Sequence, residues 1–289
     1  MKKIVQFLLF LLLSGLGSAQ NSSLSYKTTA LQLGFVETIA SKELSENRVI
    51  NIYLPQGYNA DSAATYPVIY LLDGATDEDF IPVAGLVHSF SFPWIGVLPP
   101  SILVGIANVD RKRDFLFPSN SEMDKKEFPT SGGADKFTAF IEKEVQPLIN
   151  SKYKTNKSQT IIGQSLGGLL TASILLMKPQ LFDTYIIVSP SLWWSDGSLV
   201  TQQGSSKEID KLKFLPGTKI YIGVGKEGTM KGREKWDMAS TAKLLADNLQ
   251  KSNNKNIHTF FDYLPNETHA TAGLPAVYNA FKLLNGKNK

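Results

Sequence analysis

The sequence predicts an α/β fold in which a mostly parallel, mixed sheet is covered by helices on both faces. Three observations predict it. Short apolar runs rich in β-branched residues recur along the chain, amphipathic segments with helical spacing separate them, and two strand-like runs come first. Buried strands that alternate with helices are typical of parallel sheets. The length of 289 residues is enough for one sizeable core or at most two small domains.

The chain begins with a segment that we expect to lie outside this fold. Two lysines precede an apolar run over residues 4–13, and small residues follow up to Ala19. This order is typical of a secretory signal peptide, and the run is short for a permanent bilayer anchor, which is the alternative. We expect a signal peptide over residues 1–19, cleavage near Ala19, a mature domain over residues 20–289, a secreted or periplasmic location and no stable membrane anchor.

The next elements follow from local patterns. Residues 33–40 and 48–55 are strand-like and joined by a short polar stretch, which predicts an antiparallel pair. Residues 66–74 form an apolar run that ends in glycine, which predicts a buried strand. Residues 76–90 begin with Thr76 as the expected N-cap and with acidic residues in the first turn, which predicts a helix.

The rest of the chain continues the alternation of buried strands and helices. Apolar runs predict strands at residues 101–109, 159–163, 184–189, 219–225 and 256–264. Apolar positions at helical spacing predict helices at residues 133–153, 166–178, 235–252 and 272–285.

Composition excludes several classes of protein. Removal of the two N-terminal lysines lowers the formal net charge from +4 to +2, and no basic stripe indicates nucleic-acid binding. The chain has no cysteine, so disulfides, thiolate catalysis and zinc–thiolate sites are excluded. No cluster of ligands has a spacing suited to a metal, and we expect neither a metal nor another cofactor.

A serine lies between glycines at the point where an apolar strand meets an apolar helix. Ser165 occupies the predicted turn between them. Gly163 and Gly167 remove Cβ atoms that would collide there, and Gly168 allows the helix to pack closely on the sheet. This G-x-S-x-G pattern is the nucleophile elbow. It places the serine hydroxyl at the carboxyl edge of the sheet, with the backbone N–H of Leu166 where an oxyanion would form.

A serine hydroxyl becomes a good nucleophile only when a base removes its proton and an acid orients that base. On this kind of sheet the expected chain order is serine, acid, histidine. His269 lies between the last predicted strand and the last helix, the position expected for the base. His258 lies inside a strand and is interpreted as structural, whereas His88 precedes the serine and is interpreted as a pocket wall rather than a catalytic residue.

The acid is expected just after the strand at residues 219–225. Glu227 lies two residues beyond that strand and is favoured. Asp237 resembles a helix-start residue, where a carboxylate favours the helix dipole, and it remains an alternative together with Glu234. The loop after residues 66–74 offers the backbone N–H of Ala75 as a second oxyanion donor, while Asp73 is expected to brace that loop.

Several ordered runs add a resemblance that extends from about residue 33 to residue 284. The runs "YPVIYLLDG", "IIGQSLGGLL", "SPSLWW", "GVGKEGTM" and "ETHATAG" resemble the putative-esterase (esterase D-like) family of α/β hydrolases. That family includes siderophore esterases of the enterochelin esterase type and feruloyl and acetyl esterases. The resemblance implies an α/β-hydrolase fold, Ser165 as nucleophile, His269 as base, Glu227 as acid, and Ala75 with Leu166 as oxyanion donors.

The same resemblance suggests residues for the substrate pocket. Trp193 and Trp194 are candidates for an acyl or aromatic pocket, although core packing explains them equally well. Arg111 and Arg113 are candidates for binding an anionic substrate group, with pairing to Asp114 as the alternative for this turn.

We therefore expect a serine esterase that hydrolyses carboxylic esters through an acyl-enzyme intermediate. Its expected partner is a small-molecule ester of the siderophore, phenolic or acetylated-glycan type. The alternatives are an acyltransferase of the same fold, in which another alcohol replaces water, and a ligand-binding protein without turnover.

Overall fold

One mixed sheet organises the described chain. The computed structural model describes residues 26–285, and the expected signal peptide over residues 1–19 lies outside them. Residues 26–32 contain no helix or strand. Among residues 26–285, no helix has both the length and the apolar character needed to cross a bilayer.

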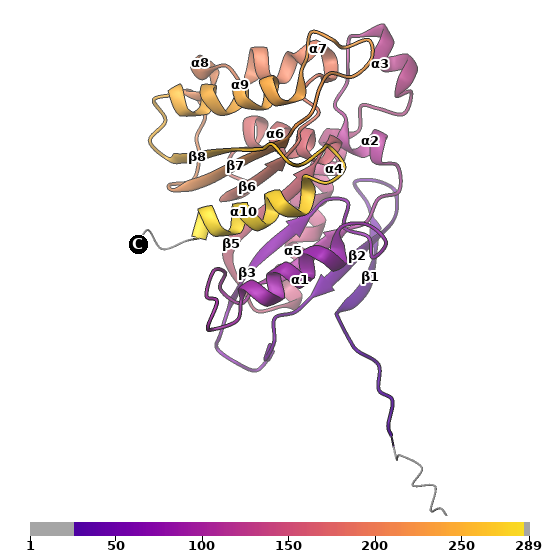
Figure 1. Ribbon diagram of the computed structural model, residues 1–289. Helices are drawn as coiled ribbons and strands as arrows, with labels where there is room; N and C mark the ends of the chain where they lie inside the picture. Colours follow the sequence, from indigo (N-terminus) through magenta and orange to yellow (C-terminus); the bar gives the residue numbers. More distant parts are fainter. Residues whose placement is uncertain (1–25, 286–289) are drawn as a thin grey trace, which may run out of the picture. The chain divides into compact units, whose positions relative to one another are not determined.

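The strand order in the sheet is β1-β2-β4-β3-β5-β6-β7-β8 (Figure 1). The strands are β1 (Phe35–Ser41), β2 (Glu46–Tyr53), β3 (Tyr66–Leu71), β4 (Ile102–Ile106), β5 (Thr155–Gln164), β6 (Thr184–Val188), β7 (Thr218–Gly225) and β8 (Ile257–Leu264). β2 runs antiparallel to both β1 and β4, and all other neighbours are parallel. The expected mixed, mostly parallel sheet with an antiparallel pair at its start is confirmed.

Helices cover both faces of this sheet, as expected. The helical segments are α1 (Phe80–Phe90), α2 (Arg111–Phe115), α3 (Glu122–Glu127), α4 (Ala134–Phe140), η1 (Ile141–Val145), α5 (Gln146–Lys152), α6 (Leu166–Met177), α7 (Trp194–Ser198), η2 (Leu199–Gln203), α8 (Ser206–Ile209), α9 (Met238–Lys251) and α10 (Gly273–Asn285). α1 and α10 lie together on one face (Figure 1). The apolar sides of α4, α6 and α9 belong to the core on the other face.

The central strands are buried on both sides, which explains their continuous apolar sequence. Ile161 of β5 packs into the core under α4, α6 and α9, and its neighbour Ile162 packs into the core under α1 and α10. In β6, Ile187 likewise packs into the first of these cores and Ile186 into the second. Because side chains alternate across a strand, a sheet covered on both faces needs apolar residues at every position.

Two helices differ in detail from the prediction. α1 begins at Phe80 with Asp79 as its N-cap, so the expectation of Thr76 as N-cap is wrong. The residues before α1 form a separate turn, in which the Glu78 carboxylate accepts the backbone N–H of Ala75 at 3.2 Å. A carboxylate that reaches back to an N–H in this way stabilises the turn, and the helix starts after it.

The long helix predicted at residues 133–153 is present but contains a wider turn, η1. There the N–H of Gln146 donates to the carbonyl of Ile141, five residues earlier. Pro147, which follows, has no N–H to donate and therefore cannot complete the ordinary α-helical ladder at this point.

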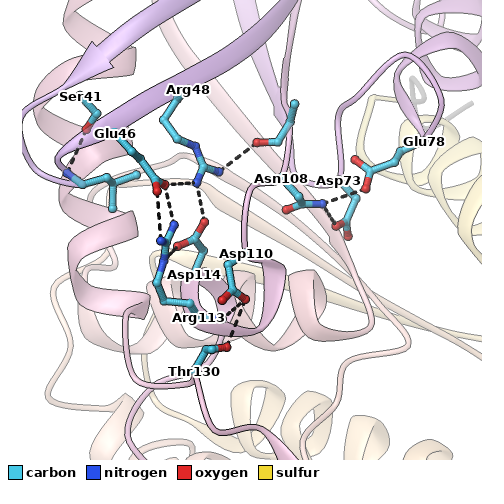
Figure 2. Close-up of polar contacts among 12 residues, drawn as sticks. Ser41, Glu46, Arg48, Asp73, Glu78, Asn108, Asp110, Arg113, Asp114 and Thr130 are labelled. Carbon is cyan, nitrogen blue, oxygen red and sulfur yellow. Dashed lines mark hydrogen bonds and ion pairs between the residues drawn. The ribbon is translucent and has the colours of Figure 1, made fainter.

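A buried ion-pair network fixes α2 against the sheet (Figure 2). Arg48 of β2 is fully buried, and its Nη1 donates to Asp114 Oδ2 at 2.6 Å and to Glu46 Oε1 at 2.9 Å. Its Nη2 donates to the carbonyl of Ala107, just beyond β4. Arg113 completes the network through Asp114 and Glu46. Four charged side chains, two from β2 and two from α2, therefore hold α2 beside β2.

Loss of Asp114 should destabilise the fold strongly. Asp114→Ala is expected to lower the free energy of unfolding by about 3 kcal/mol, because Arg48 stays buried with only Glu46 as a counter-ion. Asp247→Ala is the matched control, since its partner Lys243 is mostly exposed and such a pair contributes at most about 1 kcal/mol. Urea unfolding followed by tryptophan fluorescence measures both. Equal losses in the two variants would contradict this account.

Candidate active site

The turn between β5 and α6 holds Ser165 in a strained backbone conformation. Ser165 has φ 58° and ψ −117°, a combination that a non-glycine residue adopts only when its surroundings impose it. Its N–H donates to the carbonyl of Val188 at 3.0 Å, and its own carbonyl accepts the N–H groups of Leu169 and Ser191. The two ends of the turn are thus fixed to the neighbouring strand and to the helix.

The glycines around Ser165 allow β5 and α6 to approach. A Cβ on Gly163 would lie 2.3 Å from the carbonyl oxygen of Gly167, and a Cβ on Gly168 would lie 2.7 Å from that of Val188. Side chains are therefore excluded at both positions, as predicted. At Gly167 the nearest atom to such a Cβ is Asp73 Oδ2 at 3.2 Å, so this position is tight because of the loop after β3.

Ser165, His269 and Glu227 form one hydrogen-bonded chain. His269 Nε2 lies 2.9 Å from Ser165 Oγ, and His269 Nδ1 lies 2.6 Å from Glu227 Oε2. A carboxylate only accepts hydrogen bonds, so Nδ1 carries the proton and Nε2 is free to accept the serine proton. These three side chains come from distant segments of the sequence, and the structure places them together as predicted.

The Glu227 carboxylate is suited to stay ionised. Its side chain is 3% exposed, and its Oε1 accepts from the Ser189 hydroxyl and from the Gly225 N–H. Burial by itself would raise the pKa of Glu227, but the hydrogen bonds from His269 and Ser189 outweigh burial and lower that pKa below its usual value. A negative charge at this position can orient an imidazole and stabilise its protonated form.

The alternative acids and bases lie outside the cavity that contains Ser165. Asp237 caps α9 by accepting the Ser240 N–H at 2.7 Å, as the helix-start interpretation predicted. Glu234 accepts the N–H of Gly232 in an exposed turn. His88 contacts the Tyr53 hydroxyl at 2.9 Å on α1, and His258 is exposed on β8. None of the four is among the residues that line this cavity, so the interpretation of His88 as a pocket wall is wrong.

That cavity has a volume of about 600 Å³ and a mixed lining. Its apolar wall includes Phe128, Trp193, Met230 and Met238, and its charged side chains are Arg111, Lys226 and Glu227. It is large enough for a drug-sized organic molecule. Within residues 26–285, no group of three His, Asp or Glu side chains is placed to bind a metal ion.

The two predicted oxyanion donors have different surroundings. Leu166 is the first residue of α6 and lines the cavity, and the N–H groups of a first helical turn have no partner within the helix. Ala75 is not among the lining residues, and its N–H donates to Glu78 Oε2. An oxyanion can use Ala75 only when Glu78 releases that N–H.

Asp73 braces the loop after β3, as predicted. It adopts φ 54° and accepts two hydrogen bonds from Arg111, at 2.6 Å from Nε and 2.8 Å from Nη2. Asn108 also donates to Asp73 and to Glu78 (Figure 2). Since Arg111 Nη2 lies 3.2 Å from the carbonyl of Gln164, one guanidinium links this loop to the serine turn.

Only half of the expected pocket residues line the cavity. Trp193 and Arg111 do. Trp194 does not, because its side chain is fully buried and its Nε1 donates to the carbonyl of Phe117. Arg113 does not either, since it pairs with Asp114 and with Glu46 in the network beside β2. The expectation of Trp194 and Arg113 as pocket residues is therefore corrected.

Two residues with supporting contacts were not predicted for the site. Gln164 Nε2 donates to the carbonyl of His269 at 2.8 Å and so fixes the loop that carries the imidazole. Ser189, with φ 41°, is fully buried and donates to Glu227. Gln164 precedes Ser165, and Ser189 begins the run "SPSLWW". Both lie at the carboxyl end of a predicted strand, but their side-chain contacts depend on the three-dimensional arrangement of the loops.

Comparisons with known proteins agree on a family. The family model described as Putative esterase matches residues 41–270. Ferri-bacillibactin esterase BesA of Bacillus subtilis (strain 168) is 31% identical over 238 residues, which cover 78% of this chain and 81% of that protein. Siderophore triacetylfusarinine C esterase of Aspergillus fumigatus is 36% identical over 181 residues, 55% of this chain and 56% of that protein.

Two solved structures are also similar to this protein in fold. An IroE-like serine hydrolase from Shewanella oneidensis has a TM-score of 0.76 at 28% identity and covers 87% of this chain and 80% of its own. The BES protein from Bacillus cereus has a TM-score of 0.77 at 25% identity and covers 91% and 100%. The fold of residues 33–285 is the α/β-hydrolase fold.

Two glycine-to-alanine variants should change stability in opposite directions. Gly163→Ala is expected to lower the free energy of unfolding by about 1–3 kcal/mol, because overpacking forces backbone shifts in the turn. Gly85→Ala on α1 is the control, since its Cβ would meet nothing within 4 Å and alanine favours a helix by about 1 kcal/mol over glycine. Thermal and urea unfolding measure both variants. A stable Gly163→Ala protein would show that the close approach of β5 and α6 is not required.

Proposed function

The chain belongs to the putative esterase family and is a carboxylic-ester hydrolase, and on this premise we propose that it acts through a Ser165–His269–Glu227 triad. The observation that supports the proposal best is the continuous chain from Ser165 Oγ to Glu227, with 2.9 Å and 2.6 Å contacts at the two nitrogens of His269. Ser165, Glu227 and His269 all line the cavity, which is large enough to hold an organic ester.

In the first half of the proposed reaction, Ser165 Oγ attacks the ester carbonyl carbon. His269 Nε2 takes the hydroxyl proton, and Glu227 stabilises the imidazolium that results. The carbonyl oxygen, on which negative charge develops, accepts a hydrogen bond from the N–H of Leu166, with the N–H of Ala75 as the second donor once Glu78 has moved. The bond from the carbonyl carbon to the alcohol oxygen then breaks, and His269 returns its proton to the leaving alcohol.

In the second half, water replaces the alcohol. His269 Nε2 takes a proton from the water, whose oxygen attacks the acyl carbon. The second tetrahedral intermediate collapses when the bond to Ser165 Oγ breaks and His269 protonates that oxygen. The products are the free acid and the original enzyme. An acyltransferase would differ only in this half, and product analysis with added alcohols distinguishes the two.

Siderophore esters are the proposed substrates. The supporting observation is that a relative named as a ferri-bacillibactin esterase matches most of this chain and most of its own length. A panel of a siderophore ester, a feruloyl ester and an acetylated glycan, each assayed with purified protein, tests this choice. Faster cleavage of either of the other two esters would overturn it.

Export from the cytoplasm is also a proposal. It rests on the basic, apolar and small-residue order of residues 1–19. The N-terminal sequence of the protein isolated after expression in a bacterium with an outer membrane tests it. A mature chain that begins just after Ala19 supports export, whereas a chain that retains residues 1–19 in the cytoplasm contradicts it.

Removal of the nucleophile or of the base should abolish turnover. Ser165→Ala and His269→Ala are each expected to lower kcat/KM on a short-chain aryl ester by about 10⁴- to 10⁶-fold, because triad members act as a unit. His258→Ala is the control and should retain wild-type kinetics, since His258 is exposed on β8. Circular dichroism checks that each variant is folded. Retained turnover in a folded Ser165→Ala protein would refute the triad.

Replacement of the acid should have a smaller effect. Glu227→Gln is expected to lower kcat by about 10²- to 10⁴-fold, because the amide no longer stabilises the imidazolium charge. Asp237→Asn is the matched control, since Asp237 contacts only the start of α9. If the Asp237 variant loses more activity than the Glu227 variant, the assignment of the acid is wrong.

A further inference from the structure

Lys226 is fixed by the same elements that hold the proposed triad. It follows Gly225, the last residue of β7, and precedes Glu227. Its backbone N–H donates to the carbonyl of Glu267 at 2.6 Å, in the loop that carries His269. The backbone of Lys226 is therefore adjacent to Glu227 and hydrogen-bonded to the loop that carries His269, while its exposed side chain lines the same cavity as Ser165.

Among the residues that the structure describes, Lys226 has no counter-ion. Within residues 26–285, no carboxylate oxygen lies within 4.0 Å of its ammonium group. The other charges of the lining are already paired, because Arg111 is bound by Asp73 and Glu227 is bound by His269. Among the described residues of this lining, the ammonium group of Lys226 is thus the charge left for a substrate.

In a neighbouring cavity, by contrast, the positive charges are paired with carboxylates. That cavity, of about 760 Å³, shares Trp193 with the cavity that contains Ser165, called here the catalytic cavity. Both of its cations have carboxylate partners, since Arg233 pairs with Asp124 at 2.5 Å and Lys235 lies 4.0 Å from Asp196. Its lining contains more carboxylates than cations. An anionic group is therefore favoured in the catalytic cavity and not in its neighbour.

We propose that Lys226 makes this enzyme selective for esters that carry an anionic group, such as a carboxylate, near the scissile bond. The inference rests on the proposed function, because it assumes that the ester carbonyl lies at Ser165. An anion beside Lys226 gains a charge partner inside a cavity that Met230 and Met238 also line, and water screens a charge pair less in a partly apolar cavity than on an open surface. A neutral ester gains nothing from the ammonium group.

Two matched pairs of esters test the proposal. One pair is mono-4-nitrophenyl succinate and 4-nitrophenyl butyrate, which differ in charge on the acyl side. The other is 4-acetoxybenzoate and its methyl ester, which differ in charge on the alcohol side. The measured quantity is the ratio of kcat/KM for the anionic ester to that for the neutral ester. Differences in intrinsic reactivity within a pair cancel when variants are compared.

Lys226→Gln should lower this ratio by about three- to tenfold for at least one pair, the range between an exposed and a partly desolvated ion pair. Lys226→Glu should lower it further, and Lys226→Arg should retain it. High salt should lower the wild-type ratio and leave the Lys226→Gln ratio unchanged, because salt screens the attraction. Lys235→Gln is the control, since it removes the same charge from the neighbouring cavity.

The outcomes separate this inference from the triad. If Lys226→Gln keeps the wild-type ratio of anionic to neutral kcat/KM for both pairs of esters, the proposal is overturned. It is also overturned if this ratio falls equally in Lys235→Gln. Neither outcome affects the proposed triad, which is tested by the activity of Ser165→Ala on the neutral esters. Conversely, activity that survives in Ser165→Ala would remove the assumption on which the role of Lys226 depends.

Discussion

The close approach of β5 and α6 is the constraint on which the rest of the site depends. Ser165 can adopt its strained conformation only because Gly163 and Gly168 let the strand and the helix meet backbone to backbone. The strain is held by hydrogen bonds to β6 and to the next turn of α6. As a result, the serine hydroxyl is placed by the scaffold itself rather than by a flexible loop.

The parallel sheet then brings the partners to the serine. Glu227 follows β7 and His269 follows β8, and the carboxyl ends of parallel strands lie at one edge of a sheet. Short contacts between the loops fix their positions, since Gln164 binds the carbonyl of His269 and Ser189 binds Glu227. On the other side of the serine, Arg111 joins the loop after β3 to the same turn. The geometry of three side chains thus depends on contacts made by several others.

Much of the fold and the centre of the site could be predicted from the sequence, because both follow from local patterns and chain order. The alternation of buried strands and helices gave the architecture, and Ser165 was marked by its glycines. The remaining details depend on tertiary contacts. Arg111 and Arg113 lie two residues apart, hence about 200° apart around a helix, and only the docking of α2 decides which one faces the cavity. The sequence likewise did not show that Glu78 would occupy the N–H of Ala75.

The central claim is that Ser165 is the group that becomes acylated. Labelling with a fluorophosphonate probe, followed by mass spectrometry of the digested protein, tests it most directly, because such probes react with serines activated by a base. The account predicts one adduct on the peptide that contains Ser165, and no adduct after His269→Ala. An active enzyme that carries no adduct, or carries it on a different serine, would contradict the account.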